Sequence, residues 1–173
     1  VIHWEDFAPR NAFRNLKRYV YFYYFPVWAI SMTACCVLCN RFQAKGARTY
    51  NDDIQGTAAV TVAGILGSLR VTKGKLSEQK VLFFGAGQAN IGAAELLVKA
   101  LVEDGVDEPI ARSNVFLFDS KGLVVDGRPA EFAISDDKAP FAAKPGVGFT
   151  SSLEEAVKRV KPTHLVGAAA QPS

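Results

Sequence analysis

Residues 80–92, KVLFFGAGQANIG, decide how this chain folds. The apolar run KVLFF predicts a short buried strand of a parallel sheet, and the apolar spacing of residues 91–102 predicts a helix. The glycine turn between them has the strand–turn–helix context that a dinucleotide-binding fingerprint requires. Gly85 permits a tight turn, and Gly87 lets the backbone approach a pyrophosphate, whose charge the free N–H groups of the helix start would favour.

The fingerprint departs from its usual form at the third small position, where Asn90 stands. The neighbouring small residues Ala89 and Gly92 would let the helix pack close to the sheet. A second apolar strand, VFLF, is followed by Asp119, which would accept hydrogen bonds from an adenosine ribose. Asp119 lies 34 residues beyond Gly85, against a usual spacing of about 20, so we expect a long helix and connection. The alternative is a plain glycine turn beside a solvated aspartate.

The remainder of the chain alternates between helical and strand patterns. The stretch 57–69 is apolar on nearly all sides, so we expect a helix buried between layers. Residues 120–150 are predicted to form an irregular surface excursion. The pair Ser151–Ser152 would cap the next helix, and a third strand is predicted at 164–168. This order predicts an α/β fold with part of a Rossmann-like doubly wound parallel sheet, preceded by a helix over 5–18.

Composition excludes several classes of protein. Of the 173 residues, 49% are hydrophobic and 21% are charged, which excludes intrinsic disorder. The formal net charge of +3 is too small to argue for a nucleic-acid partner, and we expect none. The three cysteines, Cys35, Cys36 and Cys39, are an odd and clustered set, so they do not indicate a disulfide framework.

Residues 19–40 form a run of 22 residues without a single charge. This length is enough to cross a bilayer, so a transmembrane helix is one interpretation. A buried helix or strand pair that belongs to the fold is a second. A segment inserted in frame and foreign to the fold is a third, and the sequence on either side bears on it.

Two acidic pairs, Glu5–Asp6 and Asp52–Asp53, are candidates for chemistry. Such pairs are commonly solvated, but the second lies just before the apolar helix and so close to the domain interior. Two unit charges 4 Å apart cost about 4 kcal/mol at an effective dielectric near 20, so converging carboxylates need protonation, a basic partner or a cation. All-oxygen ligands suit Mg²⁺ or Mn²⁺. Spacing alone does not show that the two pairs meet.

Four blocks of the sequence together resemble consecutive blocks of the malic enzyme family: WEDFAPRNAF at 4–13, NDDIQGTAAVTVAGIL at 51–66, LFFGAGQANIG at 82–92 and FDSKGLVVDGR at 118–128. The motifs EDF and NDDIQGT are far more specific than the glycine loop. The family oxidatively decarboxylates L-malate to pyruvate and CO₂ while reducing NAD⁺ or NADP⁺, and its members are typically homo-oligomers. The resemblance therefore implies an oxidoreductase with that substrate and those cofactors.

The resemblance also implies roles for individual residues. It places Glu5, Asp6 and Asp53 as ligands of Mg²⁺ or Mn²⁺, which would chelate malate and act as a Lewis acid. It places Asp52 beside the metal, in the catalytic acid–base network. The positions that it implies for the cofactor are Thr57, Gly85, Ala86, Gly87, Gln88, Ala89, Gly92 and Asp119. Lys121 and Lys138 lie within reach of a 2′-phosphate, but the sequence leaves NAD and NADP open.

The uncharged run interrupts this resemblance. Removing residues 20–43 joins LKRY to AKGARTYNDD and restores the spacing of the family. Every Val codon begins with GT and Gln43 can be encoded by CAG, the usual ends of an intron, so we interpret the segment as a translated, unspliced intron. This interpretation argues against a membrane span. We expect residues 1–56 to be the end of the substrate and metal segment, and 57–173 the first half of the NAD(P)-binding domain.

The family's catalytic Tyr and Lys would precede Val1, and its substrate-binding Asn residues would follow Ser173. We therefore expect this chain alone to be inactive. The compartment stays open between cytosol, mitochondrion and plastid. The alternative hypothesis is a non-catalytic nucleotide-binding module, tethered to a membrane through residues 19–40. Convergence of Glu5, Asp6 and Asp53 would favour the enzyme.

Overall fold

The structure, a computed structural model, describes residues 2–4 and 49–169. The chain divides into two compact units, Val1–Gly56 and Thr57–Ser173. The expected helix over residues 5–18 and the uncharged run at 19–40 lie outside the described residues.

The first unit contains two short strands, β1 (Ile2–Trp4) and β2 (Thr49–Asn51). They pair in parallel, with Ile2 opposite Thr49 and Trp4 opposite Asn51. A π-helical turn, η3 (Asp52–Gly56), follows β2 directly. The two strands therefore end side by side, and each is followed in the sequence by one of the two acidic pairs.

The second unit is built on a four-stranded sheet in the order β5-β4-β3-β6. Strand β3 (Val81–Phe84) lies between β4 (Val115–Asp119) and β6 (His164–Gly167), and both neighbours are parallel to it. The short β5 (Gly122–Leu123) pairs antiparallel with β4 at one edge. The chain passes to one side of β3 and then returns to the other, which is the topology of a doubly wound sheet and confirms the predicted fold class.

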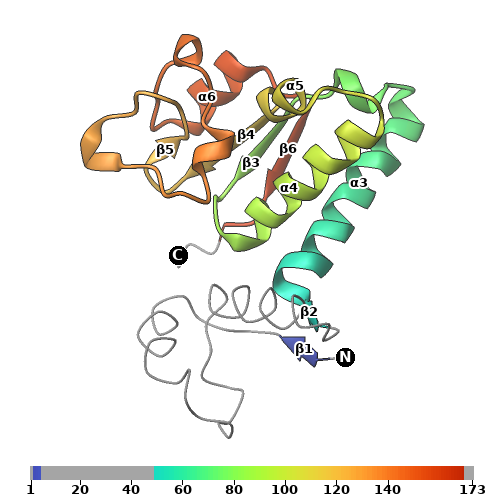
Figure 1. The fold of residues 1–173 in the computed structure, drawn as a ribbon. Helices are drawn as coiled ribbons and strands as arrows, with labels where there is room; N and C mark the ends of the chain where they lie inside the picture. Colours follow the sequence, from blue (N-terminus) through green and yellow to red (C-terminus); the bar gives the residue numbers. More distant parts are fainter. Residues whose placement is uncertain (1, 5–48, 170–173) are drawn as a thin grey trace, which may run out of the picture. The chain divides into compact units, whose positions relative to one another are not determined.

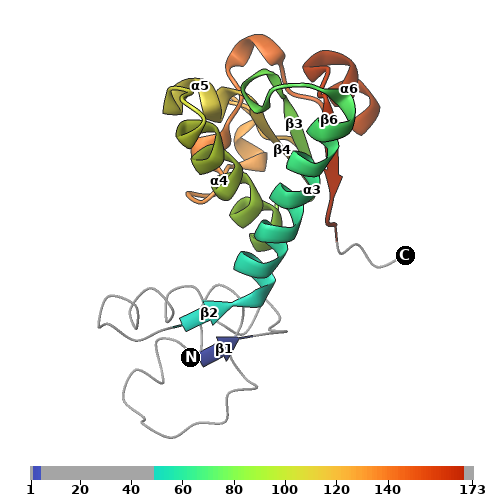
Figure 2. The same cartoon turned by 90° about the vertical axis from the view of Figure 1, so that its right-hand side faces the viewer.

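Helices cover both faces of this sheet (Figures 1 and 2). One face packs on α3 (Thr57–Thr72), α4 (Gln88–Glu103) and α5 (Glu108–Ser113), and α6 (Leu153–Val160) lies on the other. Residues of β3 alternate accordingly, because neighbouring side chains of a strand point to opposite faces. Val81 and Phe83 join the α4 side of the core, and Leu82 joins the α6 side.

Helix α3 was predicted correctly as a helix, but the expectation that it is buried between layers is wrong. Only Ala58, Val62 and Ile65 are buried, whereas Val60 and Val71 are 75% and 83% exposed. The reason is that α3 packs on α4 along a single face, and the hydrogen bond of 2.7 Å between Ser68 Oγ and His164 Nε2 joins it to β6.

Length and composition alone would let one helical stretch of the described chain, Ile54–Thr72, cross a membrane. The stretch has 19 residues and a mean hydropathy of 1.3. Core helices of soluble proteins have the same properties, so this finding is weak support for a membrane span.

The segment 120–150 is irregular, as predicted, but it is not only a surface excursion. Its regular structure is limited to β5 and three short 3-10 turns, namely η5 (Ala130–Phe132), η6 (Ala139–Phe141) and η7 (Pro145–Val147). A fourth such turn, η4 (Leu76–Glu78), precedes β3. Leu123, Val124 and Phe141 are fully buried, because backbone hydrogen bonds hold the segment against β4. Ser152 then caps α6 as expected, accepting a hydrogen bond from the Glu155 N–H.

Candidate functional site

The glycine loop joins the carboxyl end of β3 to the start of α4. Gly85 has φ +99°, a conformation that residues with a side chain rarely adopt. A Cβ atom on Gly85 would also lie 2.5 Å from the carbonyl oxygen of Ala168, just beyond β6. A side chain at this position is therefore excluded twice, by the backbone conformation and by the close approach of the neighbouring strand.

Gly87 serves a different purpose from Gly85. It is the N-cap of α4 and has an ordinary extended backbone, with φ −87°. A Cβ atom here would meet nothing within 4 Å, so the space above Gly87 is open. No side chain caps the start of the helix. An open approach to uncapped N–H groups at a helix N-terminus suits an anion, because these groups and the helix dipole both favour negative charge.

The other loop residues that were predicted to bind the cofactor lie close to this turn in the chain. Ala86 lies between the two glycines, and Gln88, Ala89 and Gly92 lie in the first turns of α4. The Gln88 side chain donates a hydrogen bond of 3.3 Å to the carboxylate of Asp137. This contact links the start of α4 to the irregular segment 120–150.

Asp119 ends β4 next to the loop, since the Gly85 N–H donates to the carbonyl of Phe118 at 2.8 Å. Its carboxylate is crowded with donors. Arg128 donates from Nη2 to Oδ1 at 2.7 Å and from Nη1 to Oδ2 at 3.0 Å. Lys138 Nζ reaches Oδ2 at 3.2 Å, and the Lys121 N–H reaches Oδ1 at 2.8 Å. One carboxylate thus holds two cationic side chains in fixed positions.

The pKa of Asp119 follows from these contacts. Burial by itself raises the pKa of this carboxyl group. The hydrogen bonds from Arg128 and from the Lys121 N–H, together with the charge of Lys138, outweigh burial and hold the pKa well below its ordinary range. Asp119 is therefore ionised at any pH near neutrality.

Arg128 belongs to this candidate site, although it was not among the residues predicted from the sequence. Its side chain is only 2% exposed, and its guanidinium lies 5.9 Å from the ring centre of Phe132 and 5.5 Å from that of Phe149. The two rings are themselves in contact, with centres 5.8 Å apart. The signal was present as the block DGR at 126–128, soon after the strand that ends in Asp119, but nothing local indicates that the chain folds back.

The predicted metal residues are only partly within the described part of the chain. Glu5 and Asp6 lie outside it, and for Asp53 the structure gives the backbone of η3 alone. Asp52 is half-buried in the same turn. Within residues 2–4 and 49–169, no group of three or more His, Cys, Asp or Glu side chains is placed to hold a metal. The metal site therefore stays a prediction, and so does the position of Thr57, the first residue of α3, beside the cofactor.

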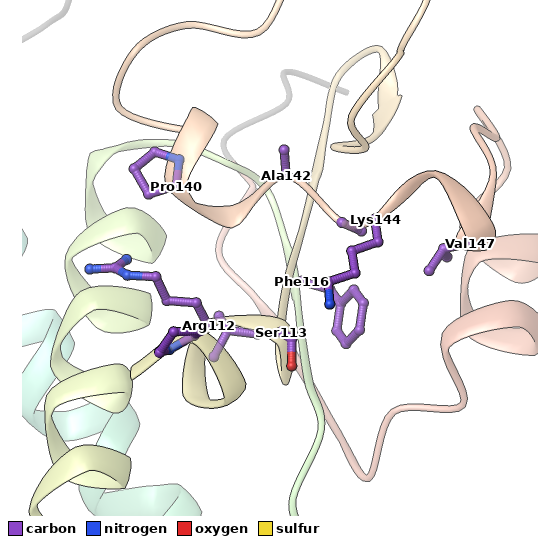
Figure 3. A pocket seen from close by; sticks show the side chains of 10 residues that line it. Arg112, Ser113, Phe116, Pro140, Ala142, Lys144 and Val147 are labelled. Carbon is purple, nitrogen blue, oxygen red and sulfur yellow. The ribbon is translucent and has the colours of Figure 1, made fainter. Parts of the chain in front are cut away.

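A separate cavity of about 270 Å³ lies at the amino end of β4 (Figure 3). Val115 and Phe116 begin β4 there, whereas the glycine loop follows the carboxyl end of β3. Arg112 lines this cavity, but its guanidinium is engaged by Glu95 and Glu108. The cavity is thus not part of the site formed by the loop and Asp119.

The doubly wound sheet, the open glycine turn and the acid at the end of the next strand define a dinucleotide-binding domain of the Rossmann type. Comparison with known proteins agrees with this class. The family model described as "Malic enzyme, NAD binding domain" matches residues 54–173. The chain belongs to the malic enzyme family.

Curated relatives extend the likeness over nearly the whole sequence. The NADP-dependent malic enzyme of Mus musculus is 43% identical over 170 residues, which cover 98% of this chain and 25% of that protein. The enzyme of the same name from Sus scrofa is 44% identical with the same coverage. The chain therefore spans about a quarter of the length of these relatives.

Solved structures show the same fold. The malic enzyme of Entamoeba histolytica has 27% identity and a TM-score of 0.61, over 84% of this chain and 28% of that one. The NAD-dependent malic enzyme of Thermotoga maritima, at 24% identity, has a TM-score of 0.64 over 82% of this chain and 34% of its own, and supports the fold alone.

Proposed function

We propose that this chain supplies the cofactor-binding half-domain and part of the metal site of an enzyme that oxidatively decarboxylates L-malate to pyruvate and CO₂. The family membership supports this activity, and curated relatives at 43% and 44% identity are named NADP-dependent malic enzymes. The cofactor, NAD⁺ or NADP⁺, would accept the hydride in this reaction. The residues of this chain would bind and orient that cofactor and help to hold the metal.

One observation carries the cofactor assignment, namely the uncapped start of α4 beside the open space over Gly87. A pyrophosphate has the charge and size that such a site favours. We assign the pyrophosphate to the loop from Gly85 to Ala89, with Gly92 letting the helix approach. The backbone N–H groups hold the phosphates without any basic side chain, so a substitution that fills the space over Gly87 should block binding.

The group of three charged residues Asp119, Arg128 and Lys138 supports NADP⁺ rather than NAD⁺. We place Asp119 at the adenosine ribose, where it orients the two cations. Both of its oxygens already accept hydrogen bonds from this chain, so little capacity is left for a free 2′-hydroxyl. Two cations against one carboxylate leave a positive field, which favours a 2′-phosphate. Lys121, exposed next to Asp119, adds to this field.

The parallel pairing of β1 and β2 supports the proposed metal site. Neighbouring strands lie about 4.8 Å apart, and Trp4 is paired with Asn51 at their ends. Glu5 and Asp6 follow Trp4, and Asp52 and Asp53 follow Asn51, so the pairing brings the two starting points together. We propose Glu5, Asp6 and Asp53 as ligands of Mg²⁺ or Mn²⁺ and Asp52 as the acid–base residue beside it. A dication there would polarise the C2 oxygen of malate.

The cofactor proposal is tested by titrating the purified 173-residue chain with NADP⁺ and with NAD⁺ in a calorimeter. We expect NADP⁺ to bind at least about tenfold more tightly, the weight of one charge-assisted contact. Equal affinities would overturn the choice of NADP⁺, and no binding of either would overturn the cofactor site. We also expect no malate-dependent formation of NADPH by this chain alone.

The metal proposal is tested by titrating the chain with Mn²⁺ and following free Mn²⁺ by electron paramagnetic resonance. We expect Asp53→Asn to weaken binding strongly. The matched control is Asp126→Asn, at an exposed position after β5, and it should bind like the unaltered chain. Equal affinities of Asp53→Asn and the control would contradict the assignment of Asp53.

A further inference from the structure

Asn90 stands where the dinucleotide fingerprint has a small residue, and it is 1% exposed in the first turn of α4. In the usual motif this position lets helix and strand pack closely. Here a larger, polar side chain lies inside the turn. The contacts of its amide show what it does there.

The Asn90 amide is fastened to the glycine loop from within. Its Nδ2 donates to the carbonyl of Gly85 at 2.6 Å and to that of Phe84 at 3.2 Å. The second carbonyl also accepts from the Ala168 N–H at 3.0 Å. Two acceptors on one side identify this atom as the nitrogen, because an oxygen would be repelled there.

The other end of the same amide is unsatisfied. Asn90 Oδ1 is buried and has no hydrogen-bond partner within the described part of the chain. An unpaired buried acceptor is unfavourable, and a glycine or alanine at this position would avoid it. Any favourable contribution of Asn90 therefore comes from its donor atom, Nδ2, which points at the loop.

Holding the Gly85 carbonyl inward has a consequence for the next N–H. In a trans peptide the C=O and the following N–H point in opposite directions. The Ala86 N–H is therefore turned away from Asn90, and it has no hydrogen-bond partner among the described residues. The free donor lies next to the open space over Gly87.

We propose that Asn90 is a positioning residue for the cofactor pyrophosphate: it fixes the Gly85–Ala86 peptide so that the Ala86 N–H faces the ligand. This inference rests on the proposed cofactor function. A small residue in the motif leaves this peptide to be oriented by packing alone, whereas this chain orients it by a side-chain hydrogen bond. Asn90 does not touch the cofactor itself.

The test compares Asn90→Ala and Asn90→Asp with the unaltered chain and with Asn114→Ala, a control at the end of α5. Each protein is titrated with NADP⁺ and with adenosine 2′-monophosphate, which has no pyrophosphate. We expect Asn90→Ala to weaken NADP⁺ roughly threefold to tenfold, the weight of one hydrogen bond, and to leave the monophosphate within about twofold. Asn90→Asp should weaken NADP⁺ further, because its carboxylate faces the Gly85 carbonyl and repels the pyrophosphate.

A second readout needs no ligand. In ¹H–¹⁵N spectra, the Ala86 amide signal should move in Asn90→Ala and stay in place in Asn114→Ala. Equal NADP⁺ affinity of Asn90→Ala and the unaltered chain would overturn the inference, as would an equal loss for both nucleotides, which indicates general loosening. An unaltered chain that binds neither nucleotide would instead overturn the proposed function, and the inference with it.

Discussion

Arg128 and Asp119, nine positions apart in the sequence, form a two-armed ion pair with bonds of 2.7 and 3.0 Å. The Arg128 side chain is 2% exposed and that of Asp119 is 10% exposed. Bidentate geometry and burial make such a pair directional and hard to replace. The pair closes the segment after β5 back onto the end of β4, next to the glycine loop. Stability and the proposed cofactor site therefore depend on the same contact.

Asp119→Asn should destabilise the fold severely. The substitution keeps the shape of the side chain but leaves the guanidinium of Arg128 buried without a counter-ion, which typically costs about 3–5 kcal/mol. Urea unfolding followed by circular dichroism measures this loss. Asp126→Asn, at an exposed position of the same segment, serves as the control and should change the free energy of unfolding by less than about 0.5 kcal/mol.

The same carboxylate should make the chain sensitive to acid. The pKa of Asp119 is lowered in the folded state, because its hydrogen bonds and cationic neighbours outweigh the effect of burial. A lowered folded pKa adds stability that is fully present above the unfolded pKa, about 3.9, and is lost as the pH falls toward the folded value. Unfolding free energies measured from about pH 7 down to about pH 3 should be flat above about pH 5 and then fall. This decline should be shallower in Asp119→Asn. An equally steep decline in the variant would show that protonation of Asp119 does not cause the loss of stability in acid.

Lys138→Ala should change the choice of cofactor more than the fold. Its ammonium group lies 3.2 Å from Asp119 and is partly exposed, so the ion pair with Arg128 survives its removal. If the cation faces a 2′-phosphate, the affinity for NADP⁺ falls roughly tenfold while that for NAD⁺ is unchanged. Lys158→Ala, on α6, removes a surface cation that pairs with Glu154 and should alter neither affinity. An equal loss of affinity for NADP⁺ and NAD⁺ would show that Lys138 does not face the 2′-phosphate.

Much of the second unit could be predicted from its sequence, because the signals there are local. KVLFF and VFLF are apolar runs long enough for buried strands and bounded by turns, and each became a strand of the parallel sheet. The glycine turn was recognisable from its context. The short helix α5 was missed, since six residues carry too little periodicity to be recognised.

The site was less predictable, because its key contacts are not local. Asp119 was expected to accept hydrogen bonds from a ribose, and Lys138 was expected near a 2′-phosphate. Nothing in the spacing indicates that Arg128 returns to Asp119 across an irregular segment. Asn90 was recognised only as a departure from the motif, because its hydrogen bonds to two carbonyl oxygens depend on how the folded turn is shaped. The exposure of α3 could not be anticipated either, because an apolar sequence does not show which elements are present to cover it.

The two loop glycines offer a matched pair of substitutions that separates folding from binding. Gly85→Ala forces a side chain into a positive φ and toward the Ala168 carbonyl, so we expect a loss of roughly 2–5 kcal/mol in the free energy of unfolding. Gly87→Ala meets open space with an ordinary backbone, so we expect it to lower the free energy of unfolding by less than about 1 kcal/mol, the usual cost of alanine at an N-cap. Its methyl group nevertheless fills the space assigned to the pyrophosphate, so NADP⁺ binding should be lost. Chemical denaturation measures the stability of both variants, and calorimetry measures their NADP⁺ binding. Tight NADP⁺ binding by Gly87→Ala would contradict the assignment of the pyrophosphate to this loop.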